Sequence, residues 1–118
     1  MILCRALVSD ESGEVPMTGL LPVRTRFFPR PQGLGYVEAV TTESNPFHPL
    51  GSVWRGHEFH YWDSTACGNA MKAVKPGGKR SWDCIHADGG LLAGFPHLYY
   101  PSNPSAAVRW LELCRKGT

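Results

Sequence analysis

The sequence predicts a mixed α/β fold in which short strands are followed by one C-terminal helix. Thirteen glycines and 10 prolines among 118 residues divide the chain into short segments, several of which are apolar and strand-like. The last segment alone carries helix signals at both of its ends. A content of 42% hydrophobic and 19% charged residues is typical of a globular chain, and the length predicts a single domain.

The first half of the chain is interpreted as a series of strands. The stretch "MILCRALV" fits either a strand or the last turns of a helix, because periodicity does not decide over so few residues. In "MTGLLPVRTRFF" we expect a strand interrupted at Pro22, with Val23, Thr25 and Phe27 on one face. The stretches "GLGYVEAVTT" and "SVWRGHEFHYWD" predict two further strands.

The second half contains the clearest element, a helix over 103–115. Asn103 is a good N-cap, Pro104 suits the first helical position, and Gly117 is a terminator. The helical face expected to pack on a sheet carries Ala107, Trp110 or Leu111, and Cys114. Before the helix, residues 64–90 look loop-like and polar with "KPGGKR" at the tip, and "LLAGFPHLYY" is consistent with a buried strand.

Charge and hydropathy exclude several classes of partner. A net charge of +2 and a pI near 8.4 are too weak to predict a nucleic-acid partner. No apolar run approaches the ~20 residues that span a bilayer, and the N-terminal stretch lacks a secretory signal pattern, so we expect a cytoplasmic protein with no membrane partner.

The scattered cysteines match no zinc pattern and are expected to be free thiols; they are Cys4, Cys67, Cys84 and Cys114.

The stretch "WRGHEFHYWD" concentrates histidines and a glutamate. If it is a strand, alternation sends His57 to one face and Glu58 with His60 to the other, so the two histidines cannot bind one ion. We therefore expect no metal site, and Glu58 with His60 could be either a functional pair or a structural hydrogen bond. His97 follows a strand-like run, where α/β enzymes place catalytic groups, although a histidine there is more often structural.

Four pieces of the chain together resemble a known family. In order, they are "PMTGLLPVRT", "RPQGLGYVEA", "NPFHPLGSVWRGHEFHYWD" and "LLAGFPHLYYPSNPSAAVRWLE". They resemble the C-terminal glutamine amidotransferase domain of cobyrinic acid a,c-diamide synthases, from the first residues to the last helix. The resemblance implies that residues 1–118 are the C-terminal portion of a three-layer, flavodoxin-like class I glutaminase, with a mixed or largely antiparallel sheet and a C-terminal helix.

The resemblance also implies an activity. Enzymes of this family amidate the a and c carboxylates of a corrinoid, cobyrinic acid, in cobalamin biosynthesis, and a glutaminase half supplies the ammonia. Glutamine and cobyrinic acid would be the parent enzyme's substrates, while ATP and Mg²⁺ would bind a synthetase domain outside residues 1–118. The proton-transferring histidine of the family corresponds to His97, and Tyr99 stands where other glutaminases of this fold have a glutamate. Residues expected to shape the site are Arg55, Gly56, Glu58, His60 and Tyr61.

The family's cysteine nucleophile has no counterpart among the matched positions. It lies in a glycine-rich turn, and Met1 corresponds to the methionine just after that turn. Cys4 corresponds to a position that is usually glycine, and Cys67 and Cys84 fall in the variable loop region. We therefore expect a partial domain that lacks the nucleophile elbow and is inactive alone, with an in-frame Cys-Gly-Gly turn encoded upstream of Met1.

Two alternatives stay open at this point. The chain could be a non-catalytic remnant that binds a tetrapyrrole or a partner chain. It could also be a fragment of a related amidase that acts on another tetrapyrrole, such as sirohaem. The intact "GLGY" and "RGHEFHY" motifs favour the cobyrinic acid enzyme over both.

Overall fold

The computed structural model describes residues 1–117, which divide into two compact units. The first unit combines Met1–Leu34 with Phe59–Cys67, and the second combines Gly35–Glu58 with the chain from Gly68 onward. Of the three crossing points, the first two fall inside the strands Gly33–Thr41 and Val53–His60, and the third lies in the segment between Ser64 and Met71. The sequence therefore shows no composition change at these points, and it predicted one domain without such a division.

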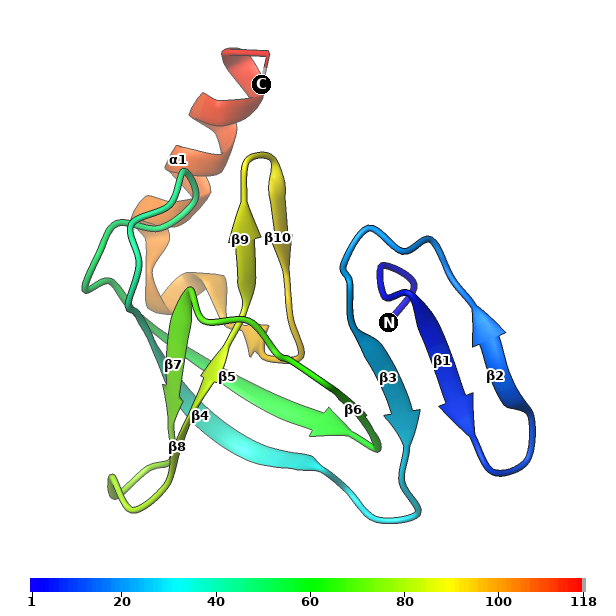
Figure 1. Cartoon of the computed structure of the whole chain (residues 1–118). Coiled ribbons are helices and arrows are strands. Elements are labelled where there is room, and N and C mark those ends of the chain that lie inside the picture. Colours follow the sequence, from blue (N-terminus) through cyan, green and yellow to red (C-terminus); the bar gives the residue numbers. More distant parts are fainter. Residues whose placement is uncertain (118) are drawn as a thin grey trace. The chain divides into compact units, whose positions relative to one another are not determined.

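The first unit contains a four-stranded sheet in the order β2-β1-β3-β6 (Figure 1). Strand β1 pairs antiparallel with β2 and parallel with β3, which pairs antiparallel with β6. Of the three residues expected on one face, Val23 and Thr25 are buried, and the hydroxyl groups of Thr25 and Ser64 are hydrogen-bonded at 2.7 Å. Phe27 is 42% exposed and is not a core residue. The strands are β1 Ala6–Ser9, β2 Gly13–Pro16, β3 Arg24–Phe27 and β6 Trp62–Ser64.

The second unit is built on a five-stranded sheet in the order β11-β5-β4-β7-β8. Its pairs β11–β5, β4–β7 and β7–β8 are antiparallel, and a separate antiparallel pair is formed by β9 and β10. The strands are β4 Gly33–Thr41, β5 Val53–His60, β7 Met71–Val74, β8 Ser81–Cys84, β9 His86–Asp88, β10 Leu91–Ala93 and β11 His97–Leu98. The mixed sheet structure with one C-terminal helix that the sequence predicts is thus confirmed.

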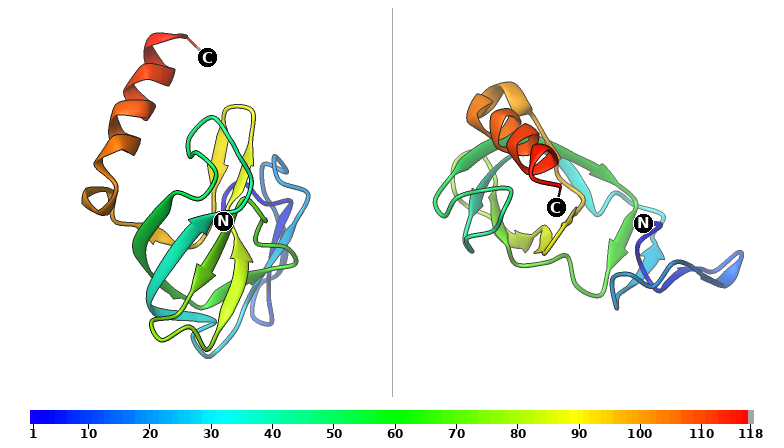
Figure 2. Two further views of the ribbon diagram at one scale, coloured as in Figure 1. Left: turned by 90° about the vertical axis from the view of Figure 1, so that its left-hand side faces the viewer. Right: turned by 90° about the horizontal axis from the view of Figure 1, so that it is seen from above.

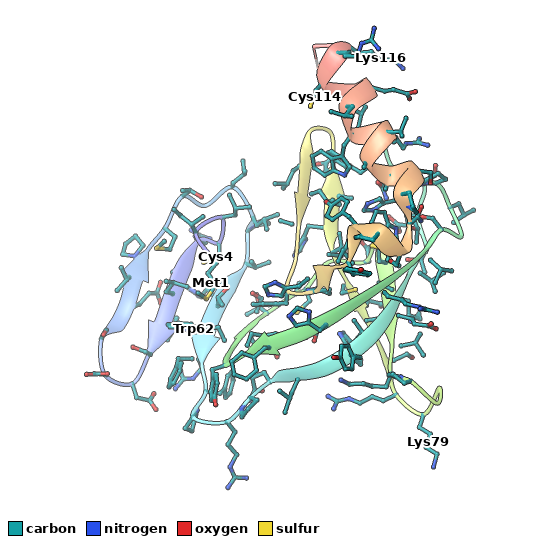
Figure 3. All side chains as sticks on the ribbon, turned by 180° about the vertical axis from the view of Figure 1, so that it is seen from behind. Met1, Cys4, Trp62, Lys79, Cys114 and Lys116 are labelled. Atoms are coloured by element: carbon teal, nitrogen blue, oxygen red, sulfur yellow. The ribbon has the colours of Figure 1, made fainter. Side chains whose placement is uncertain are left out.

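The loop predicted over residues 64–90 is wrong for residues 71–74, 81–84 and 86–88, which form strands. Strands β7 and β8 form a hairpin with the "KPGGKR" tip as its turn, and Lys79 projects from that tip (Figure 3). Met71 and Ala73 are completely buried, while Lys72 points outward to Asp83 in an ion pair of 2.9 Å. Because charged residues alternate with the buried ones, the hairpin has the polar average composition of a loop.

Helix α1 spans Pro104–Arg115 and follows a 3₁₀ turn, η1, at Tyr100–Ser102. Its start at Pro104 and its end before Gly117, at φ 64°, are as predicted. Of the predicted packing face, the Trp110 alternative is confirmed, because Trp110 is half-buried while Leu111 is exposed. The other two positions are wrong by one residue: Ala106 is buried and Leu113 half-buried, whereas Ala107 and Cys114 are exposed.

Helix α1 packs on the apolar core of the second unit through Ala106 and, further along, on the loop between β4 and β5. The Trp110 ring lies 4.7 Å from the Phe47 ring, and Arg109 Nε donates to the carbonyl of Pro46 at 2.7 Å. The helix extends away from the five-stranded sheet (Figure 2). Within residues 1–117, no helix is both long enough and apolar enough to span a bilayer.

Candidate functional site

His97 begins β11, the edge strand of the five-stranded sheet, and its backbone is fixed along β5. In the antiparallel register, His97 lies opposite His57 and Leu98 lies opposite Gly56. The attachment continues past the strand: the Tyr99 amide donates to the Arg55 carbonyl at 2.7 Å. Ser102 Oγ then accepts from the Arg55 amide at 2.9 Å, so the chain after His97 stays bound to β5 up to η1.

Alternation along β5 sorts the predicted site residues onto two faces. Trp54, Gly56 and Glu58 are buried, whereas Arg55 and His57 are exposed. His97 is exposed beside His57, and the two imidazole rings stack with centroids 4.8 Å apart and planes 17° apart. The open face of this edge therefore presents two imidazoles side by side.

Glu58 and His97 do not meet in the structure, because they lie on opposite faces of the sheet edge. Glu58 is only 4% exposed, and its carboxylate accepts a hydrogen bond from Trp82 Nε1 at 3.2 Å. The Trp82 ring is in turn covered by the cationic groups of Lys75, at 5.8 Å, and Arg80, at 5.5 Å. Glu58 therefore belongs to a buried polar arrangement on the face of β5 opposite His97.

Gly56 allows the close approach of β11 to β5. A Cβ atom on Gly56 would lie 2.6 Å from the carbonyl oxygen of His97 and 3.3 Å from its carbonyl carbon. The neighbour is backbone, so it cannot rotate away as a side chain would. A side chain at this position must displace the segment that carries His97.

Gly56→Ala should therefore lower the free energy of unfolding by about 1–3 kcal/mol, as overpacking does elsewhere. Urea unfolding of the chain measures it. The matched control is Gly90→Ala, because a Cβ atom on Gly90 would meet no atom within 4 Å and the residue has no positive φ. The control should change stability by no more than about 1 kcal/mol. Equal midpoints for the two variants would contradict the close approach.

His60 and Tyr61 belong to the first unit, since the division falls between Glu58 and Phe59. His60 Nδ1 lies 2.6 Å from the carbonyl oxygen of Trp62, so this nitrogen carries the proton and donates it. Tyr61 stacks on Phe27 with centroids 6.3 Å apart and meets the edge of Phe59 at 5.9 Å. Tyr61 is thus part of an aromatic cluster beside β6, and His60 is bound to the backbone of β6.

Comparison with known proteins identifies relatives along nearly the whole chain. The cobyrinate a,c-diamide synthase of Syntrophotalea carbinolica is 30% identical over 98% of this chain, and the match covers 26% of that relative. The enzyme of the same name from Salmonella typhimurium is 27% identical over 92% of the chain and 25% of the relative. The hydrogenobyrinate a,c-diamide synthase of Mesorhizobium japonicum is 47% identical over 58% of the chain and 16% of the relative.

The chain belongs to the cobyrinate a,c-diamide synthase family. It spans about a quarter of the length of the curated relatives that it matches, with 26% of the S. carbinolica protein covered. No family model matches the chain, and no solved structure matches it. The resemblance expected from the "GLGY" and "RGHEFHY" motifs is thus confirmed by these relatives.

No disulfide joins the four cysteines of this family member in the part of the chain that the structure describes. Cys4 is buried and donates to the Ala6 carbonyl at 3.3 Å, and Cys67 donates to the Asp63 carboxylate at 3.4 Å. Cys84 is part of the apolar core of the second unit, and Cys114 is exposed on α1 (Figure 3). Among residues 1–117, no three metal-ligating side chains gather into a group that could hold an ion.

His48 is a buried residue that sequence reasoning passed over. It is completely inaccessible to solvent, its ring lies 4.6 Å from the Trp54 ring, and neither ring nitrogen has a hydrogen-bond partner. Burial, and secondarily the positive charge of Arg109, lowers the pKa of His48 from 6.5 to about 4. The "SNPFHP" stretch predicts a turn, and the Asn45 side chain indeed accepts from the His48 amide at 2.8 Å, but nothing in it signals burial.

Proposed function

We propose that this chain carries the proton-transferring histidine of the ammonia-supplying glutaminase half of a corrinoid a,c-diamide synthase. Family membership along the chain supports the proposal, and one observation carries it. His97 lies exposed on a strand edge, beside the "RGHEFHY" strand, and its backbone is fixed there by β5. An exposed imidazole on a fixed backbone is accessible to a substrate, which a proton-transfer group must be able to reach.

In the proposed reaction, a cysteine thiolate attacks the side-chain amide carbon of glutamine. The new S–C bond forms, the C–N bond breaks, and His97 gives a proton to the departing ammonia. Water then hydrolyses the thioester, releasing glutamate and restoring the thiol. Cys4, Cys67 and Cys84 do not correspond to the nucleophile, so we expect the chain alone to release no ammonia from glutamine above background.

The acceptor of the ammonia is proposed to be a corrinoid. The relatives are named as a,c-diamide synthases of cobyrinate and of hydrogenobyrinate, so the shared substrate chemistry is a pair of carboxylates, a and c, carried by the corrinoid. Activation of these carboxylates by ATP and Mg²⁺ would take place in a synthetase domain, outside the quarter of the relatives that this chain matches. The described residues would thus provide ammonia rather than bind the ring.

A chimera tests the proposal. The matching segment of the S. carbinolica synthase is replaced by this chain, and amidation is measured separately with glutamine and with ammonium as the nitrogen source. We expect both activities, because the exchanged segment would complete the glutaminase half. A chimera that uses ammonium normally but cannot use glutamine would contradict the proposal and favour a non-catalytic remnant.

A further inference from the structure

We propose that His57 is a positioning residue that holds the imidazole of His97 in one orientation through ring stacking. The inference rests on the role proposed above for His97. It goes beyond that role because His57 lies on the β5 face that sequence reasoning left without a function. Its basis is the pairing of the two residues in the β5–β11 register and the contact between their rings.

The backbone on both sides of this pair is already fixed. The His97 carbonyl lies directly against Gly56. Two residues later, the Tyr99 amide donates to a backbone carbonyl of β5 at 2.7 Å. The freedom that remains is rotation of the His97 side chain. An exposed side chain normally samples several rotamers, so a second contact is needed to select one of them.

The stack is the contact that makes this selection. Directly opposite residues on antiparallel strands bring their side chains together, and the 17° angle between the ring planes places the two rings nearly parallel. Within residues 1–117, no other protein group forms a hydrogen bond with either ring that would compete with this contact. The orientation of the His97 ring is therefore determined by His57.

Stacking also suits a ring that must transfer protons. It uses the face of the imidazole, so both nitrogens at the ring edge stay available, whereas a carboxylate that orients the ring occupies one of them. The position two residues after His97 holds Tyr99, which is 60% exposed and carries no acid. His57 thus supplies the orientation that an acidic neighbour would otherwise give.

The first test uses the chain itself and needs no activity. In ¹H–¹³C spectra of the histidine rings, cross-relaxation should connect the ring protons of His57 with those of His97. His57→Leu should move the His97 ring signals toward random-coil positions, and His57→Phe should keep them displaced by an aromatic neighbour. Unchanged backbone amide spectra verify that both variants fold. His97 ring signals that do not respond to His57→Leu would overturn the inference.

The second test uses the chimera with glutamine as the nitrogen source. His57→Leu should lower kcat about tenfold, as expected when a proton-transfer group is present but misoriented, with the KM for glutamine little changed. His57→Phe should restore most of the rate, and amidation with ammonium should be the same in all three proteins. Equal rates for the Leu and Phe variants would contradict positioning by the ring. A chimera without glutamine activity refutes the proposed function, while the ring spectra still decide on His57.

Discussion

Lowering the pH from 6.5 to 4 should reduce the free energy of unfolding by about 3 kcal/mol through His48 alone. The native pKa of about 4 lies below the ordinary value of 6.5, which the unfolded chain regains. Between these two pKa values, the His48 ring is mostly protonated in the unfolded state and mostly neutral in the native state. The free energy of unfolding therefore falls as the pH falls. Below pH 4 the native state binds the proton as well, and the loss through His48 levels off.

The physical cause is the surroundings of the His48 ring. Both nitrogens are buried without a partner, so a charged ring would lose its hydration with no compensating acceptor. Arg109, held by its hydrogen bond to Pro46, adds a like charge. Protonation of His48 should therefore weaken the contact between the β4–β5 loop, which carries His48, and α1, which carries Arg109.

Urea unfolding at several pH values measures this loss, and His48→Gln and His48→Leu are the comparison variants. Each variant starts from its own stability, so the quantity to compare is the slope of unfolding free energy against pH. Both variants should show a slope smaller than that of the original chain between pH 4 and 6.5. An unchanged slope would mean that His48 is not the responsible group.

Much of the fold could be predicted from local signals. The start of α1 at Pro104 and its end at Arg115 follow from Pro104, Gly117 and the polar stretch before the helix, because such signals depend on neighbouring residues only. The packing face of α1 could not be predicted in the same way. It depends on Phe47, which comes from a loop far away in the sequence, as well as on the apolar core of the second unit, which Ala106 joins.

For the candidate site, too, the local features could be predicted and the long-range ones could not. Alternation along "VWRGHEFH" correctly separates His57 from Glu58, because a strand's side chains alternate whatever surrounds it. The register of β11 against β5 is a long-range property, so the sequence could not show that His57, and not Glu58, lies opposite His97. The burial of His48 is equally non-local, since Trp54 packs against its ring and the charge of Arg109 comes from α1.

His97→Asn in the chimera should lower glutamine-dependent amidation by about 10²–10⁴-fold, the usual contribution of a general acid–base group. Asparagine is similar in size and still forms hydrogen bonds, but it cannot transfer a proton near neutral pH. Amidation with ammonium should be unchanged, because that reaction bypasses the glutaminase half. The matched control is His86→Asn on β9, a half-buried histidine of the same unit, which should alter neither activity more than about twofold.

The ratio of the glutamine-dependent to the ammonium-dependent rate in the chimera tests the central claim most directly. Both rates come from one preparation, so differences in folding, corrinoid binding and carboxylate activation cancel. We predict that the ratio falls at least about 100-fold on His97→Asn while the ammonium rate stays within about twofold. A ratio that is the same with asparagine as with histidine would show that His97 transfers no proton in this reaction.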